Sequence, residues 1–172
     1  MDEQPVLPEL CAQMAAQRLP RWAELPDLAL YMDQLLALME RYLGGQPGFE
    51  RKGITASMVN NYVKLGVMPP PEKKRYGRTH LSRLIEICLL KPSLPIEAIG
   101  QLLSRSLAEC DEAAFYDAFC AYAERAAAAA AEAATQGTDA LLPPVCAAAL
   151  RAQAERSLAL GLCAGSLPEK KR

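Results

Sequence analysis

Residues 57–64 of this 172-residue chain carry the side chains best suited to bind a ligand from one surface. On a helix at ~100° per residue, the polar members of this segment share one face and the apolar members share the other. Asparagine is unfavourable inside a helix because its side chain competes for backbone hydrogen bonds, so two asparagines in succession need a reason. The polar face consists of Ser57, Asn60, Asn61 and Lys64.

Two interpretations of this polar face are open. An asparagine can cap a neighbouring element or bond a buried carbonyl, which is a structural role. Alternatively, the face contacts the major groove of DNA, because Asn can bond an adenine edge at two points while Ser and Lys bind phosphates or guanine. The residues that follow favour DNA, since three prolines and a basic cluster after a polar-faced helix are typical of a winged helix-turn-helix. The cluster comprises Lys73, Lys74, Arg75 and Arg78.

Helices must position this surface, and the apolar spacing predicts several. Thr55 is the expected N-cap of the recognition helix, and Gly66 is its expected left-handed C-terminal residue. Asp27 is the expected cap of a preceding helix with a wide apolar face. The predicted flanking helices cover residues 8–19, 28–43, 80–91, 95–103, 109–134 and 143–163.

The last two predicted helices are rich in alanine. Alanine buries little apolar area, so such helices gain stability by approaching one another, or a second subunit, very closely. We therefore expect a helical hairpin that forms a homodimer, in a C-terminal region over 107–172 that follows a DNA-binding domain over 1–106. An alternative is that the alanine tract is low-complexity sequence with no partner.

The charge distribution supports a nucleic-acid contact, although the net charge is −1. Residues 1–49 carry three basic and seven acidic side chains, whereas residues 50–91 carry nine basic and three acidic ones. Residues 92–172 are again acidic, with seven basic and ten acidic side chains. Positive charge is thus confined to the segment expected to meet phosphates. The alternative is that the basic segment is only a solvated turn.

Other functional classes find little support in the sequence. No segment offers a nucleophile with its base, a metal cluster or a glycine-rich phosphate loop, so we expect neither an enzyme nor a cofactor. His80 stands alone, and the six cysteines form no close pair, so we expect reduced, mostly buried thiols. No run reaches the ~18 apolar residues of a membrane span. The acidic, proline-broken N-terminus is unlike a signal peptide, so we expect a cytoplasmic protein.

The run VNNYVKLGVMPPP, followed by KKRY, HLSRLIEI and LPIEAIGQLL, resembles the DNA-binding region of the mercury-resistance regulator (MerR) superfamily. The resemblance implies that Asn60 and Tyr62 occupy the positions of an arginine and a tyrosine on the recognition helix. It also implies that Lys74 replaces an arginine that binds the DNA backbone, with Tyr76 supporting it. Two features depart from the pattern: Asn60 removes a phosphate contact, and residues 44–54 stand where a tight turn is expected.

A longer stretch, LPRWAELPDLALYMDQ with ITASMVNNYVKLGVMPPPEKKRY, resembles an uncharacterised family of bacterial MerR-like proteins that carries its own N-terminal helices. The resemblance implies an all-α fold: a winged helix-turn-helix with a small β wing, flanked by N-terminal helices and the C-terminal hairpin.

These observations predict a sequence-specific protein that binds double-stranded DNA as a homodimer, a role that the resemblance extends to transcriptional regulation of the MerR type. The alternative is a helical interaction module that keeps the winged fold and binds a protein partner. A small-molecule effector between the C-terminal helices is left open. The expected DNA-binding residues are Ser57, Asn60, Asn61, Lys64, Lys73, Lys74, Arg75, Tyr76 and Arg78.

Overall fold

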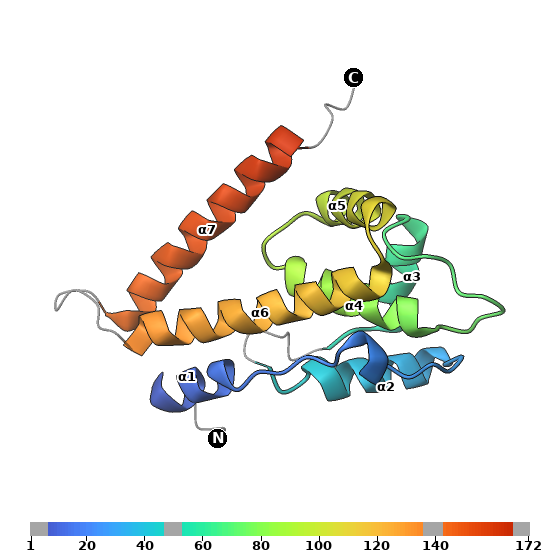
Figure 1. Ribbon diagram of the computed structural model, residues 1–172, viewed down its shortest axis with the longest axis horizontal. Helices are drawn as coiled ribbons and strands as arrows, with labels where there is room; N and C mark the ends of the chain where they lie inside the picture. The colour runs from blue at the N-terminus through green and yellow to red at the C-terminus, as the bar shows by residue number, and fades with distance from the viewer. Residues whose placement is uncertain (1–6, 47–52, 136–142, 167–172) are drawn as a thin grey trace.

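The computed structural model describes residues 7–46, 53–135 and 143–166, and these residues form an all-helical fold, as predicted (Figure 1). Seven α-helices and one short 3-10 helix, η1, are present in the described residues. They are α1 (Leu7–Ala15), η1 (Trp22–Glu24), α2 (Met32–Leu43), α3 (Ala56–Lys64), α4 (Arg78–Leu90), α5 (Ile96–Glu109), α6 (Glu112–Thr135) and α7 (Pro144–Ser166).

Helix α4 is the most buried element, because every side chain from Leu81 to Ile87 is buried. Figure 1 shows α6 as a long rod along the molecule, with α1 and α2 below it and α5 above it. Tyr116 and Cys120 of α6 lie in the same hydrophobic core as the buried residues of α2 to α5. The hydrophobic core therefore continues past the predicted domain boundary at residues 106 and 107. The division into two domains stays a prediction.

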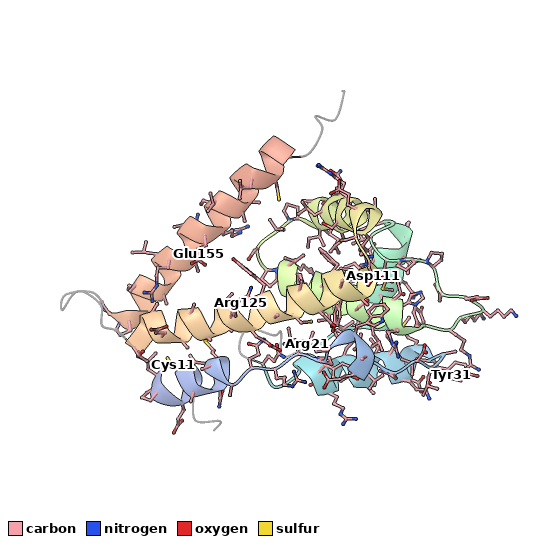
Figure 2. All side chains as sticks on the ribbon, viewed as in Figure 1. Cys11, Arg21, Tyr31, Asp111, Arg125 and Glu155 are labelled. Atoms are coloured by element: carbon pink, nitrogen blue, oxygen red, sulfur yellow. The ribbon has the colours of Figure 1, made fainter. Side chains whose placement is uncertain are left out.

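The segment between α1 and α2, residues 16–31, is called the strap here. It is bound to α6 through two acidic side chains, since Glu124 Oε1 accepts from the Leu19 amide at 2.7 Å and Asp117 Oδ1 accepts from the Trp22 amide at 2.7 Å. Figure 2 shows Cys11 of α1 and Arg21 of the strap on the same side of α6. The strap is thus an ordered part of the fold.

Helix α2 begins at Met32, so the prediction of a helix from residue 28, capped by Asp27, is wrong. Residues 28–31 are instead non-helical: Leu30 pairs with Tyr76 through two backbone hydrogen bonds of 2.8 and 2.9 Å, and Tyr31 is extended. The Gln34 side chain accepts from the Tyr31 amide at 2.9 Å, which is one of the two hydrogen bonds of a capping box at the start of α2.

The expected β wing is also wrong, since the described residues contain no β-strand. Two isolated β-bridges occur instead: Leu30 with Tyr76, and Glu72 with Arg75. A longer ladder cannot form here because the prolines at 69–71 have no amide hydrogen to donate and because the strap, rather than a second wing strand, pairs with Tyr76. Residues 72–76 therefore form a short turn, called the basic turn below.

Helix α7 lies apart from the core. Figure 1 shows it diverging from α6 beyond the connection between them, so the two helices do not pack along their lengths as expected for a hairpin. Near the connection, Arg151 Nη1 donates to the Ala133 carbonyl at 3.2 Å. Large apolar side chains of α7 remain exposed by 62–74%: Val145, Leu150, Leu158 and Leu162.

All six cysteines are free thiols, and three of them are buried: Cys11, Cys120 and Cys163. No helix within the described ranges is long and apolar enough to cross a membrane.

Candidate nucleic-acid interface

Helix α3 begins and ends at the predicted residues. Thr55 Oγ1 accepts from the Met58 amide at 3.3 Å, which confirms the N-cap. Gly66 has φ +70°, which confirms a left-handed residue just after the helix. The amides of Val67 and Met68 then both donate to the Tyr62 carbonyl, at 3.0 and 3.2 Å. These contacts fix both ends of a short helix.

The two faces of α3 have opposite environments. Val59 and Tyr62 are buried in the core, whereas the predicted polar face is exposed along its whole length. The side chains of Asn60 and Asn61 make no hydrogen bond to any described residue. The capping interpretation of the asparagines therefore has no contact in this part of the chain to support it. The exposed set is Ser57, Asn60, Asn61 and Lys64.

The basic turn has an unusual backbone. Glu72 and Arg75 exchange amide-to-carbonyl hydrogen bonds of 3.1 and 2.8 Å, while Lys73 and Lys74 both have positive φ, +48° and +64°. This is the conformation of a two-residue hairpin turn that favours Asn-Gly, and each non-glycine residue in it costs about 1 kcal/mol. Both lysines are exposed and form no ion pair with a described residue.

Arg75 is held by the strap and is not free for a ligand. Its guanidinium carbon lies 3.5 Å from the centroid of the Tyr31 ring, and its Nη1 donates to the Ala29 carbonyl at 3.1 Å. A further hydrogen bond joins Nη2 to the Tyr31 hydroxyl. The arginine therefore anchors the basic turn to the protein itself.

Tyr76 and Arg78 are held in the same way. The Tyr76 ring is buried edge-to-face against His80, with centroids 5.3 Å apart, and this burial raises the pKa of the Tyr76 hydroxyl. Arg78 Nε donates to the Leu25 carbonyl at 3.1 Å, and its guanidinium lies 5.7 Å from the Trp22 ring centroid. Arg78 Nη2 also lies 3.9 Å from Asp27 Oδ2, so the strap holds this guanidinium through two of its nitrogens.

The structure thus divides the nine predicted residues into two groups. Three of them, Arg75, Tyr76 and Arg78, fasten the basic turn to the strap. Figure 1 shows α3 and the turn that follows it at the end of the molecule opposite α1. The six that remain exposed are Ser57, Asn60, Asn61, Lys64, Lys73 and Lys74.

Two residues near this surface were missed by sequence reasoning. Lys91, exposed at the end of α4, lies 6.0 Å from the Tyr62 ring centroid and so adds a cation beside α3. It was predicted as the last residue of the helix over residues 80–91, but its contact with α3 is tertiary. Tyr31 falls inside the helix predicted over residues 28–43, so its stacking with Arg75 had no signal in the sequence.

The arrangement offers binding groups but no catalytic constellation. His80 has a structural role, because its Nδ1 accepts from the Gly77 amide at 3.0 Å and so caps the start of α4. Among the residues that the structure describes, no group of three or more His, Cys, Asp or Glu side chains is placed to hold a metal ion.

Comparison with known protein families identifies the family of this chain. The model of the Domain of unknown function (DUF1836) matches residues 20–123, which is more than half of the chain. The chain belongs to the DUF1836 family. The DUF1836 span contains most of the strap, all nine predicted site residues and the first half of α6, and it leaves α1 and α7 outside. No curated protein and no solved structure matches this chain.

Proposed function

We propose that this DUF1836 protein binds double-stranded DNA in a sequence-specific manner through the exposed face of α3 and the tip of the basic turn. The observation that carries the proposal is a pair of exposed asparagines that have no hydrogen-bond partner among the described residues, on a helix whose other face is fixed in the core. Asn60 and Asn61 contact base edges, while Ser57 and Lys64 bind phosphate or guanine. The lysines of the turn contact the backbone.

The local charge favours phosphate as the ligand. Residues 50–91 carry nine basic and three acidic side chains, and Lys73 and Lys74 are held at the tip of the turn in a strained backbone. Strain retained at an exposed position is a common feature of functional sites. In this proposal the strained backbone holds both lysine charges at the tip of the turn, where both can contact phosphate.

A role in transcription, of the MerR type, is the finer part of the proposal. It is supported by the order of the motifs, with a Tyr-x-Lys-x-Gly helix end followed by a basic turn and two helices. This region differs from the β wing expected from the MerR resemblance, because the backbone of the basic turn pairs with Leu30 of the strap and not with a second wing strand. Arg75, Tyr76 and Arg78 act in this account as positioning residues.

The homodimer is proposed from α7. A 23-residue helix with leucines exposed by 62–66% gains stability when a second copy covers it. The charged residues of α7 include both signs, so an antiparallel copy brings Glu155 toward Arg151 or Arg156 of the second chain. A twofold dimer would present two α3 helices to a nearly palindromic site.

A protein-interaction module is the second candidate. Leu65, immediately after α3, is 46% exposed beside the polar face, and such a mixed surface also suits a protein partner. The two candidates differ in salt dependence, because phosphate contacts release counterions and a mixed protein interface does not release them to the same extent.

The test is fluorescence anisotropy with a labelled duplex of random sequence, titrated at several salt concentrations. The informative variant is Lys73→Asn with Lys74→Gly, which removes both charges while supplying the residues that the turn prefers. We expect it to be more stable than the wild type by about 1 kcal/mol or more, yet to bind DNA less tightly. The slope of log affinity against log salt should fall by about 2.

Arg125→Gln is the matched control, because Arg125 is exposed on α6 and lies outside both the proposed DNA interface and the proposed dimer interface. It should leave the salt slope unchanged. Binding that does not depend on salt, or a double variant that binds random DNA as tightly as the wild type, would contradict the proposal.

A further inference from the structure

A pocket of about 500 Å³ that is open to solvent, called the cavity below, lies between the strap and α2, away from the residues proposed to contact DNA. This volume is within the range of small-molecule sites, and the lining combines apolar and charged side chains. Its apolar lining is formed by Leu19, Pro20, Pro26, Leu38 and Tyr42. Its charged residues are Arg18, Glu24 and Arg41.

The charges around the cavity are not balanced. Glu24 is already satisfied, because Oε1 accepts from Arg18 Nη2 at 2.8 Å and Oε2 accepts from the Arg21 amide at 2.6 Å. These contacts, led by the backbone hydrogen bond from Arg21, lower the pKa of Glu24 and keep it ionised. Arg41 has no hydrogen bond or ion pair with a described residue. The cavity therefore has one uncompensated positive charge beside an apolar wall.

We propose that this cavity binds a small monocarboxylate with an apolar body. The carboxylate pairs with Arg41, whose planar guanidinium can donate two parallel hydrogen bonds. The body packs against Leu38 and Tyr42 of α2 and against the prolines of the strap. A neutral molecule of the same shape leaves the arginine unpaired, and a small anion lacks the apolar contact, so each should bind more weakly.

The cavity shares its wall with the support of the basic turn. Glu24 and Pro26 line the cavity, and the carbonyl of Leu25 between them accepts from Arg78 at 3.1 Å. Further along the strap, Ala29 and Leu30 hold the basic turn through Arg75 and Tyr76. A ligand that stabilises the strap should therefore also stabilise the turn, and any effect of this coupling on DNA binding rests on the proposed DNA-binding function.

The test uses NMR of the ¹⁵N-labelled full chain without DNA. The probes are benzoate and 2-naphthoate, with benzamide as the uncharged match and acetate as the match without an apolar body. We expect the two aromatic carboxylates to cause saturable amide shifts in residues 18–26 and 38–42, with smaller shifts in residues 72–76. Benzamide and acetate should bind at least about tenfold more weakly.

Arg41→Gln should weaken binding of both aromatic carboxylates by about tenfold or more, whereas Arg125→Gln, which changes an exposed arginine on α6, should not. The proposal is overturned if neither carboxylate gives saturable shifts up to ~10 mM, if benzamide binds as well as benzoate, or if Arg41→Gln has no effect. Shifts confined to the cavity would overturn the link to the turn. Because no DNA is present, failure of the DNA-binding proposal cannot produce any of these results.

Discussion

The guanidinium of Arg75 stacks on the ring of Tyr31, 3.5 Å from the ring centroid, although 44 residues separate the two in the chain. This contact joins the basic turn to the strap. The paired backbones of Leu30 and Tyr76 lie directly beside it. The strap therefore has the place that a second wing strand would occupy, and the orientation of Lys73 and Lys74 depends on it.

Tyr31→Ala should loosen the basic turn without unfolding the protein. An exposed arginine–aromatic contact contributes about 0.5–1 kcal/mol, so the loss of global stability should be of that size. Amide hydrogen exchange in residues 72–76 should become faster, as measured by mass spectrometry. Tyr122→Ala is the control, since Tyr122 is also exposed beneath an arginine but lies on α6. Equal exchange in the two variants would contradict the role given to Tyr31.

Glu124→Gln should destabilise the fold by about 1–2 kcal/mol, because hydrogen bonds to a charged group are lost. In the wild type, the carboxylate of Glu124 bonds both terminal nitrogens of Arg21, at 2.9 and 2.5 Å, and Arg21 lowers its pKa. Urea denaturation measures the change. Glu109→Gln, on the exposed surface of α5, should alter stability by less than ~0.5 kcal/mol. A similar small effect at Glu124 would show that the strap is held by other contacts.

Glu86 should make stability depend on pH. Its side chain is 2% exposed, Arg83 Nε lies 3.8 Å from its Oε2, and burial raises its pKa from 4.5 to about 7. Arg83 opposes this rise, and the nearby Glu112 adds to it. Because the folded state binds the proton more tightly, the contribution of Glu86 to stability is greatest below about pH 4.5 and is lost as the pH rises to about 7.

Glu86→Gln, which mimics the protonated form, should remove this dependence. The measurement is the difference in unfolding free energy between the wild type and the variant, from denaturation at about pH 5 and about pH 8. The advantage of the variant should be larger at the higher pH, by an amount on the order of 2 kcal/mol. The comparison also separates Glu86 from Glu124, whose lowered pKa acts in the opposite direction in both proteins. A constant difference across this range would contradict a raised pKa at Glu86.

Gly66→Ala should destabilise the protein by about 1–2 kcal/mol, because an alanine at φ +70° is strained even though space is available for its methyl group. Gly161→Ala is the opposite case. Gly161 lies inside α7 with open space around it, so alanine should stabilise that helix by up to ~1 kcal/mol. Thermal unfolding of the two variants should therefore show melting temperatures that move in opposite directions. Movement in the same direction would rule out a left-handed Gly66 as the end of α3.

Local signals in the sequence were sufficient for α3. A cap bond spans three residues, as between Thr55 and Met58, and a left-handed glycine is determined by its own position, so neither depends on distant parts of the chain. The same reasoning identified the exposed face that carries Asn60 and Asn61. Helical periodicity is enough to separate that face from the buried one.

Contacts between distant segments explain what the sequence did not reveal. Residues 28–31 have helical periodicity, but they lie outside the helix, and Leu30 pairs with Tyr76 instead. Arg75 and Arg78 were assigned to DNA by their charge, whereas both bond backbone carbonyls of the strap, which carry no signature in the sequence. The carboxylates of Asp117 and Glu124 hold the strap, and no local pattern around either residue indicates that contact.

The central claim, that the exposed face of α3 recognises DNA sequence, is tested most directly by selecting bound duplexes from a random pool with the wild-type chain and with Asn60→Ala and Asn61→Ala. We predict that the wild type selects a short, nearly palindromic motif. Each variant should lose preference at one base position in each half-site, at a cost of about 1–3 kcal/mol, and keep the others. A wild-type pool without a motif, or variants that lose affinity equally for every sequence, would contradict the claim.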